Sequence, residues 1–551
     1  MTFFVPQALV AFLGAWIVWG LSKRLLLKGP LDSIPGPPPE SWLMGNLDHF
    51  LDSNSWAYID KMVKRYGRVW RITGVLKGSY LFVYDPKALY HMVVKAQDVF
   101  EESEDLLRLN SKVFGDGLLA TVGNHHRKQR KLLNPAFSTA RMRELTPTFY
   151  NVVHKLENSI SQQVANGEAE IDVLHWMSRT ALELIAQSGF GYSFDDLGPE
   201  TVEHPYSTSA KSYFAVSNDP GILLARFLIY PYVHKIGSPN FQRAVLNILP
   251  WPRLRQLRDI VDIMHKTSLE IFKSAKQSVK DGKDVSDRPG GGKDIMSILI
   301  QANMDASDQD KLPDEELIAQ ISTLTLAAMD TTSNALARVL DLLSEHPVVQ
   351  ERLRQEVAEA FAAHGDDLDY DTLNGLPFLE AVVRESLRYH TPVAYLPRQA
   401  TRDTILPVAT PIKTLDGGEI NEIFIPKGQE IFISLFDCNR DPEIWGPDAE
   451  EWKPDRWLSP LPSSVTESRV PGIYSNLMTF LGGGRACIGF KFSQLEIKIV
   501  LSLLVKRFKF SPSGKKVIWL CNGVTQPTVE DPNLPDNGRL KTQLPLKVSV
   551  V

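Results

Sequence analysis

The sequence predicts a mainly α (α+β) fold, tied to a membrane by an N-terminal transmembrane helix. Three observations support this fold class. Residues 1–22 contain no charged side chain. Apolar residues recur with a spacing near 3.6 through the middle of the chain, and an uninterrupted run at residues 314–345 predicts one long central helix. Short runs typical of β-strands lie on either side of this helical region, which predicts small β-sheets.

The N-terminal segment is long enough to cross a bilayer, since about 20 apolar residues in a helix match a hydrocarbon core of about 30 Å. Trp16 and Trp19 suit the membrane interface, and the cations Lys23, Arg24 and Lys28 follow at once. Because positive residues stay on the cytoplasmic side, we expect the rest of the chain in the cytoplasm. A cleaved signal peptide is the alternative, but the segment lacks a basic start and ends in bulky residues.

Three regions follow from this pattern. Residues 1–22 are the predicted anchor, and residues 23–40 form a basic and proline-rich linker that contains the stiff sequence IPGPPP. Residues 41–551 contain no internal repeat and no clean linker. We therefore expect one large domain over residues 41–551.

Strands and helices are expected at separate places in that domain. The strand-like runs are residues 69–72, 80–84 and 420–435. The helical runs are residues 178–188, 259–279, 314–345, 347–363, 378–389 and 490–508.

Composition excludes several classes of protein. The net charge of −5 argues against nucleic-acid binding. The three cysteines form no C-x-x-C pair and no even framework, so neither a structural zinc site nor a disulfide scaffold is favoured. The large domain is therefore expected in a reducing compartment.

The most informative stretch is residues 480–489, FLGGGRACIG, which places Cys487 between glycine turns. Glycine permits close approach of the backbone, so the sulfur can point at a large flat group beside the loop. A lone cysteine beside glycines is most often an inert buried thiol. Here every fixed position of F-x-x-G-x-R-x-C-x-G is matched, and the loop resembles the haem-thiolate loop of the cytochrome P-450 monooxygenases.

This resemblance spans residues 35–530, is similar to the fungal microsomal members, and implies the cytochrome P-450 fold with haem b (iron protoporphyrin IX) as cofactor. It makes Cys487 the axial ligand of the haem iron, and Phe480, Arg485 and Gly489 cofactor-binding residues of the same loop. Arginine suits the haem propionates, because its planar fork binds carboxylates better than lysine does.

Two further cation sites match the family in part. Residues 123–130 (GNHHRKQR) resemble the W-x-x-x-R helix, with His126 in the place of tryptophan and Arg130 as a propionate ligand. A plain basic surface helix is the alternative for this cluster. Arg398 matches the arginine of the strand that follows the E-x-x-R helix.

The E-x-x-R motif itself is Glu385 and Arg388, whose spacing places both side chains on one helical face. Taken alone, such a pair is usually solvated and contributes little. With Arg456 of the later segment WKPDRW, it resembles the family's buried structural triad. Buried charges must be paired, so this triad is expected to serve folding and haem loading.

Residues 327–332 (AAMDTT) place an acid and hydroxyls inside an apolar helix and resemble the family's oxygen-site motif. Asp330 then matches the acid that relays protons, and Thr331 the hydroxyl at the oxygen-binding position. The alternative is a threonine that bonds back to a carbonyl one turn earlier. Ala328 replaces the usual glycine, which we expect to modulate coupling.

The resemblance implies a monooxygenase that inserts one oxygen atom from O2 into a lipophilic small molecule, with a terpenoid or other secondary metabolite favoured. The sequence contains no G-x-G-x-x-G after a strand, so a separate NADPH-cytochrome P-450 reductase is expected as electron donor, with cytochrome b5 as a second candidate. The implied location is the endoplasmic reticulum membrane. Two alternatives are a haem-thiolate isomerase or dehydratase, and a non-catalytic haem- or lipid-binding protein.

Overall fold

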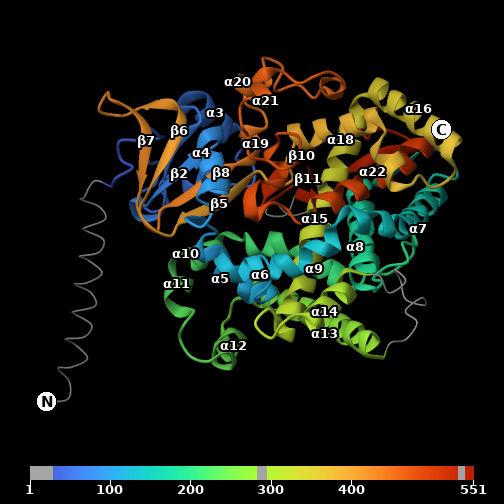
Figure 1. Ribbon diagram of the computed structural model, residues 1–551, viewed down its shortest axis with the longest axis horizontal. Helices are drawn as coiled ribbons and strands as arrows, with labels where there is room; N and C mark the ends of the chain where they lie inside the picture. Colours follow the sequence, from blue (N-terminus) through green and yellow to red (C-terminus); the bar gives the residue numbers. More distant parts are fainter. Residues whose placement is uncertain (1–28, 282–293, 531–539) are drawn as a thin grey trace. The chain divides into compact units, whose positions relative to one another are not determined.

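The computed structural model describes residues 29–281, 294–530 and 540–551 (Figure 1). The predicted anchor at residues 1–22 and the first part of the linker lie outside these ranges. Within the described ranges, no helix has both the length and the apolar character needed to cross a membrane.

The chain forms two compact units that alternate along the sequence. The β-rich unit comprises Met1–Ser103, of which residues 29–103 are described, with Tyr395–Ile444 and Ser463–Arg485. The helical unit comprises Glu104–Ala394, Trp445–Pro462 and Ala486–Val551. Because each unit is assembled from three separate segments, no single linker marks their boundary in the sequence.

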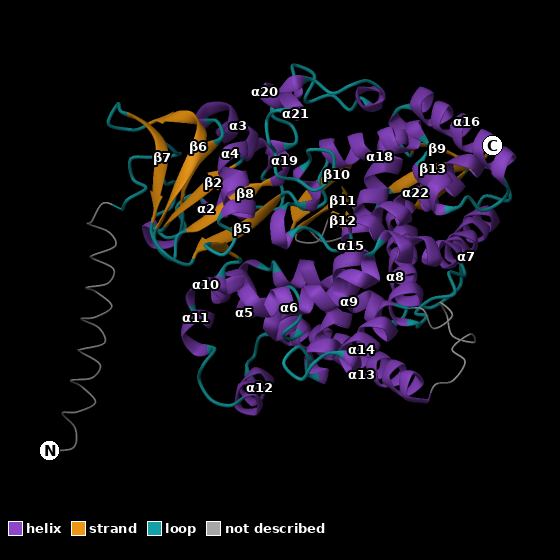
Figure 2. Cartoon of the chain, viewed as in Figure 1, coloured by secondary structure: helices purple, strands orange, loops and turns teal. Residues whose placement is uncertain are grey.

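The β-rich unit is built on a five-stranded sheet with mixed pairing (Figure 2). Its strands are, in spatial order, β1 (Val69–Thr73), β2 (Ser79–Val83), β8 (Glu430–Ser434), β5 (Tyr395–Ala400) and β3 (Phe100–Glu101). Only β2 and β8 run parallel. The hairpin of β6 (Thr404–Lys413) and β7 (Glu419–Ile425) belongs to the same unit. Its helices are α2 (Leu47–Leu51), α3 (Trp56–Tyr66), α4 (Pro86–Tyr90), η2 (His91–Lys95), α19 (Leu435–Cys438) and α21 (Ser463–Thr466).

The helical unit is centred on α15 (Asp314–Glu345), which lies side by side with α8 (Val173–Phe190) (Figure 1). Three acidic residues in the first turn of α15 stabilise the start of the helix, because negative charge interacts favourably with the positive end of the helix dipole. Its C-terminus is fixed by Pro347, which cannot continue a helix and instead occupies the first turn of α16 (Pro347–His364). The predicted central helix at residues 314–345 is therefore confirmed at both ends.

The other elements of this unit surround α15. Its remaining helices are α5 (Glu104–Phe114), α6 (Gly123–Leu133), α7 (Thr139–Gln163), α9 (Pro205–Ser217), α10 (Pro220–Leu228), α11 (Tyr230–Val233), α12 (Pro239–Ile248), α13 (Pro252–Asp281), α14 (Ile295–Asp305), α17 (Tyr370–Asn374), α18 (Pro377–Tyr389) and α22 (Phe490–Arg507). Its two sheets have the orders β10 (Val517–Asn522), β11 (Val524–Glu530), β12 (Leu540–Thr542) and β4 (Ala169–Asp172), β13 (Pro545–Val550), β9 (Phe508–Pro512). The predicted mainly helical α+β class with small sheets is thus confirmed, whereas the N-terminal membrane helix stays a prediction.

Candidate active site

Cys487 lies in the helical unit, two residues before the N-cap of α22, which is Gly489. Cys487 is exposed to solvent. The protein around its sulfur nevertheless disfavours the charged form and raises the pKa of the thiol. The Gly489 backbone N–H and the charge of Arg130 act in the opposite direction and favour the thiolate. An accessible thiol held in this way is suited to bind a metal.

Arg130 supports the cysteine loop directly. Its Nη1 donates a hydrogen bond to the Ala486 carbonyl oxygen at 2.5 Å. His126 lies one turn earlier on α6 and is buried. The spacing of four places both residues on the same side of α6, so the structure brings the two predicted cofactor-binding residues of this helix together.

Residues 480–485 of the loop belong to the β-rich unit. Glycine is required there because the loop backbone lies close to the backbone of η2. Gly483 has φ of +64°, and a Cβ there would lie 1.7 Å from the Val93 carbonyl oxygen. Gly484 donates its N–H to Gln97 Oε1 at 2.8 Å. Phe480 packs edge-to-face on Tyr474 with ring centroids 5.6 Å apart. These residues fix the loop backbone against η2.

Two of the predicted propionate ligands meet in the β-rich unit. Arg398 lies on β5 and donates to Glu102 at 2.9 Å, and Arg485 donates to Glu101 at 3.0 Å. Glu101 and Glu102 are consecutive residues at the end of β3, so each of the two arginines has its own carboxylate partner there. A guanidinium has five N–H donors, more than one carboxylate accepts, so each arginine retains the chemistry needed for a propionate.

The middle of α15 has a short uncovered stretch in an otherwise buried helix. Ala327 is exposed, and Ala328, Asp330 and Thr331 are half-buried. The Thr331 hydroxyl donates to the Ala327 carbonyl oxygen at 2.7 Å, the back-bond that the sequence left open as an alternative. Burial raises the pKa of the Asp330 carboxyl to about 7, and the charge of Lys211 offsets part of that rise. An acid that changes its protonation near neutral pH is suited to move protons.

Glu385 and Arg388 form a fully buried pair on α18. Arg388 Nε and Nη2 each donate to a Glu385 carboxylate oxygen at 2.8 Å. Arg456 Nε reaches Glu385 Oε1 at 3.4 Å, and Trp457 Nε1 donates to Oε2 at 2.9 Å. The structure therefore brings the three predicted triad residues into contact and adds Trp457, which the sequence analysis missed.

Arg388 also fastens this pair to the segment after α20 (Pro442–Trp445). It donates to the Ala449 carbonyl oxygen at 2.7 Å and to the Glu451 carbonyl oxygen at 2.8 Å. Arg456 in turn donates to Asp448 Oδ1 at 2.8 Å. The two Arg388 contacts join segments about 60 residues apart in the sequence, as expected of a pair that stabilises the fold.

The residues present fit haem. Cys487 offers an accessible sulfur, a soft ligand that suits iron. Arg130, Arg398 and Arg485 offer N–H donors for carboxylates, and the uncovered stretch of α15 offers small side chains beside an acid and a hydroxyl.

Comparison with known proteins decides the family. The family model described as cytochrome P450 matches residues 35–530. The chain belongs to the cytochrome P450 family. Cytochrome P450 monooxygenase 91 of Postia placenta is 47% identical to it over 97% of both chains. Ganoderic acid synthetase of Ganoderma lucidum is 42% identical over 95% of this chain and 96% of its own. A cytochrome P450 monooxygenase of Hericium erinaceus is 36% identical over 98% and 97%, respectively.

This cytochrome P450 is therefore a monooxygenase with haem (iron protoporphyrin IX) as cofactor, and its likeness to fungal members is confirmed. When bound, haem supplies the iron centre at which dioxygen is activated. Cys487 stays the predicted axial ligand, Phe480, Gly489 and the arginines the predicted cofactor-binding residues, and Asp330 and Thr331 the predicted proton-handling pair.

Proposed function

We propose that this cytochrome P450 is a membrane-anchored enzyme that inserts one oxygen atom into a lipophilic small molecule, a terpenoid or another secondary metabolite. The observation that carries the proposal is the uncovered Asp330–Thr331 stretch within a buried helix. A protein that only carries haem or lipid has no use for an acid and a hydroxyl at such a position, and neither has an isomerase or dehydratase that does not activate dioxygen. In this proposal Cys487 binds the haem iron, while Asp330 and Thr331 hold and deliver protons.

Membrane attachment is supported by two separate features. Residues 1–22 have the length and composition of an anchor. In the helical unit, exposed apolar side chains gather over α10 to α12 and the residues beside them: Leu224, Ile229, Tyr232, Val233, Ile236, Phe241, Val245, Ile248 and Leu249. A contiguous set of exposed apolar residues is typical of a surface that meets a lipid phase or a partner. We propose that the catalytic part faces the cytoplasm at the endoplasmic reticulum membrane.

An NADPH-cytochrome P450 reductase is the proposed electron donor. Three lysines of α6 and α22 are the proposed contact. Lys131 is mostly exposed and lies 4.0 Å from Asp310. Lys128 donates to the Gln309 and Lys311 carbonyl oxygens at 2.7 and 2.9 Å, and Lys491 donates to Thr139 at 2.8 Å. Lys131 is thus the strongest candidate of the three for a reductase contact.

A secondary-metabolite substrate is supported by the Ganoderma lucidum relative, whose name, ganoderic acid synthetase, is that of a biosynthetic enzyme. The test is an optical titration of the purified haem-loaded protein with terpenoids, fatty acids and aromatic compounds, followed by turnover with reductase and NADPH. We expect one class to change the haem spectrum and to yield an oxygenated product. Spectral changes without any NADPH-dependent product from the same compounds would refute the monooxygenase proposal for them and favour a binding protein.

A further inference from the structure

The β-rich unit contains a buried guanidinium whose capacity for hydrogen bonds is only partly used. Arg398 lies on β5 and is buried. Its Nη1 donates to Glu102 Oε2 at 2.9 Å and to the carbonyl oxygen of the neighbouring Pro397 at 2.8 Å. Its Nε and Nη2 donate to no other residue that the structure describes. Arg398 therefore keeps two of its three guanidinium nitrogens for a further acceptor.

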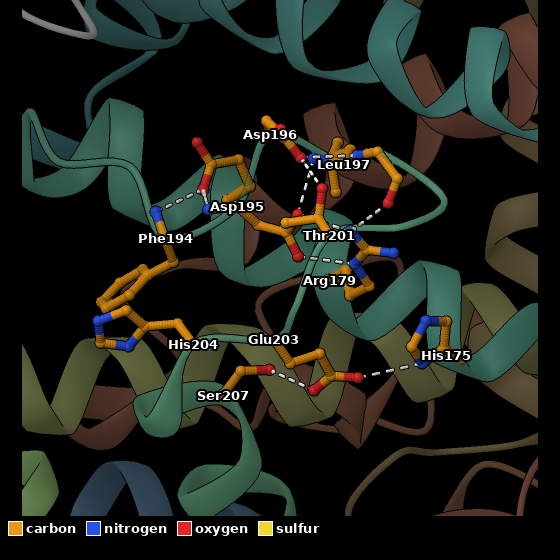
Figure 3. Close-up of polar contacts among 12 residues, drawn as sticks. His175, Arg179, Phe194, Asp195, Asp196, Leu197, Thr201, Glu203, His204 and Ser207 are labelled. Carbon is orange, nitrogen blue, oxygen red and sulfur yellow. Dashed lines mark hydrogen bonds and ion pairs between the residues drawn. The ribbon is translucent and has the colours of Figure 1, made fainter.

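Two other buried arginines use this same pair of nitrogens to bind a carboxylate. Arg179 donates to Asp195 from Nε at 2.6 Å and from Nη2 at 2.7 Å (Figure 3). Arg388 binds Glu385 through its Nε and Nη2 as well. In both pairs the planar fork holds one carboxylate by two parallel bonds, which is a strong geometry for this contact. The Nε–Nη2 edge of Arg398 is therefore suited to a second carboxylate, such as a haem propionate.

Glu102 is fixed beside Arg398 by the register of the sheet. β3 and β5 pair antiparallel, with Glu101 across from Gln399. Continued by one residue, this register sets Glu102 across from Arg398, and directly opposed side chains in a sheet lie within contact distance. The side chains of Glu102 and Arg398 are only 15% and 3% exposed, so solvent screens their pairing weakly. The backbone therefore builds this ion pair into the sheet independently of any cofactor.

The charges at this end of β3 are balanced within the protein. Glu101 pairs with Arg485 at 3.0 Å, and both side chains are largely buried. With Glu102 and Arg398, two guanidinium groups thus meet two carboxylates, and their charges cancel. A propionate that binds Arg398 therefore meets a cation that Glu102 already compensates in part. A weakly screened negative charge of this kind also disfavours the addition of an electron to the haem that carries the propionate.

We propose that Glu102 is a positioning residue for haem that acts through Arg398. It holds Nη1 so that the Nε–Nη2 edge stays available to a propionate, and its charge weakens the attraction between Arg398 and that propionate. Glu102 thereby limits how tightly haem is retained, and it lowers the reduction potential of the haem iron. This inference goes beyond the proposed function, since it rests on haem as cofactor and on Arg398 as a propionate ligand, whereas the substrate has no part in it.

The test uses two readouts of the haem-loaded protein that need no substrate. Haem transfer to an excess of apomyoglobin is followed by absorbance, and the reduction potential of the iron is measured by spectroelectrochemical titration. Glu102→Gln keeps an acceptor oxygen for Arg398 but removes the charge. We expect haem transfer from this variant to slow by roughly fivefold, as for a charge contact of ordinary strength, and its reduction potential to rise.

Two further substitutions separate the charge of Glu102 from its positioning of Arg398. Glu102→Ala removes the acceptor as well, so we expect faster haem transfer together with a raised potential. Glu102→Asp keeps the charge, so its potential should stay near the wild-type value. A Glu102→Ala protein that fails to retain haem would be the extreme form of the expected result, and the comparison of Glu102→Gln with Glu102→Asp still tests the charge.

Asp98 provides a matched control in the same unit. It pairs with Arg402 at 3.4 Å, but both side chains are more than half exposed. Because water and salt screen such a pair, Asp98→Asn should leave the haem transfer rate and the potential unchanged. A second control tests the route through Arg398: in an Arg398→Gln protein, Glu102→Gln should no longer slow haem transfer.

The outcomes that contradict the inference are distinct from those that contradict the proposed function. Faster haem transfer in both Glu102→Gln and Glu102→Ala, with an unchanged potential, would mean that the pair only stabilises the sheet and would overturn the inference. Wild-type values of both readouts in Glu102→Gln would overturn it too. A haem-loaded wild-type protein that forms no oxygenated product would instead overturn the proposed function and leave this inference standing, since neither readout depends on turnover.

Discussion

Arg388→Ala removes the cation of a fully buried ion pair, so we expect a large loss of stability. Arg388 and Glu385 are both fully buried, and the arginine makes two bonds to the carboxylate and two to the carbonyl oxygens of Ala449 and Glu451. Its removal takes the two short charged hydrogen bonds from the buried Glu385 carboxylate and leaves Arg456, at 3.4 Å, as the cationic partner. Breaking one side of such a pair costs about 3–5 kcal/mol. Since a folded protein is stable by only about 5–15 kcal/mol, much of the net stability is at stake.

The assay is urea denaturation followed by tryptophan fluorescence, together with haem content per protein. We expect Arg388→Ala to unfold at a much lower urea concentration and to purify with little haem. Arg402→Ala is the control, because Arg402 forms an exposed pair with Asp98 that contributes at most about 1 kcal/mol. An Arg388→Ala protein with wild-type stability and haem content would refute the reasoning.

A double variant tests whether the loss of charge pairing causes the expected instability of Arg388→Ala. Removing both charges with Glu385→Gln and Arg388→Met leaves no isolated buried ion, so it should destabilise the protein less than Arg388→Ala does. A double variant that is less stable than Arg388→Ala would mean that shape and hydrogen bonds at this place matter more than charge compensation.

Three further predictions concern the candidate site. Thr331→Val removes one intrahelical hydrogen bond, so stability should change by only about 1 kcal/mol. The amount of product formed per NADPH consumed should fall. An unchanged ratio of product to NADPH would argue against a role of Thr331 in proton delivery. Burial raises the pKa of Asp330 from 3.8 to about 7. The stabilising contribution of its neutral form is therefore present below about pH 4 and is lost as pH rises through about 7, so the urea midpoint should decline over this range. Asp330→Asn should make the urea midpoint less dependent on pH. Gly483→Ala should destabilise the loop, because its Cβ would meet the Val93 carbonyl oxygen and its φ is positive. Gly489→Ala meets no atom within 4 Å, so normal stability with loss of haem in that variant would assign Gly489 to the cofactor.

The sequence predicted the elements that depend on local patterns. Apolar periodicity, the acidic first turn and Pro347 define α15, and these signals lie within a few residues of each end. The spacing of Glu385 and Arg388 likewise places their side chains on one face of α18.

Features that depend on distant segments could not be predicted in this way. Arg398 meets Glu102 because β3 pairs with β5, a contact between residues about 300 apart, and Arg485 meets Glu101 across 384 residues. The division into two units was missed because each unit is made from three separate segments.

The central claim is that Cys487 binds the haem iron as a thiolate. The most direct measurement is the optical spectrum of the haem-loaded wild-type protein beside that of Cys487→His, since imidazole is also an iron ligand and retains haem. We predict a thiolate-type spectrum for the wild type and an imidazole-type spectrum for the variant. Identical spectra for the two proteins would contradict the assignment of Cys487.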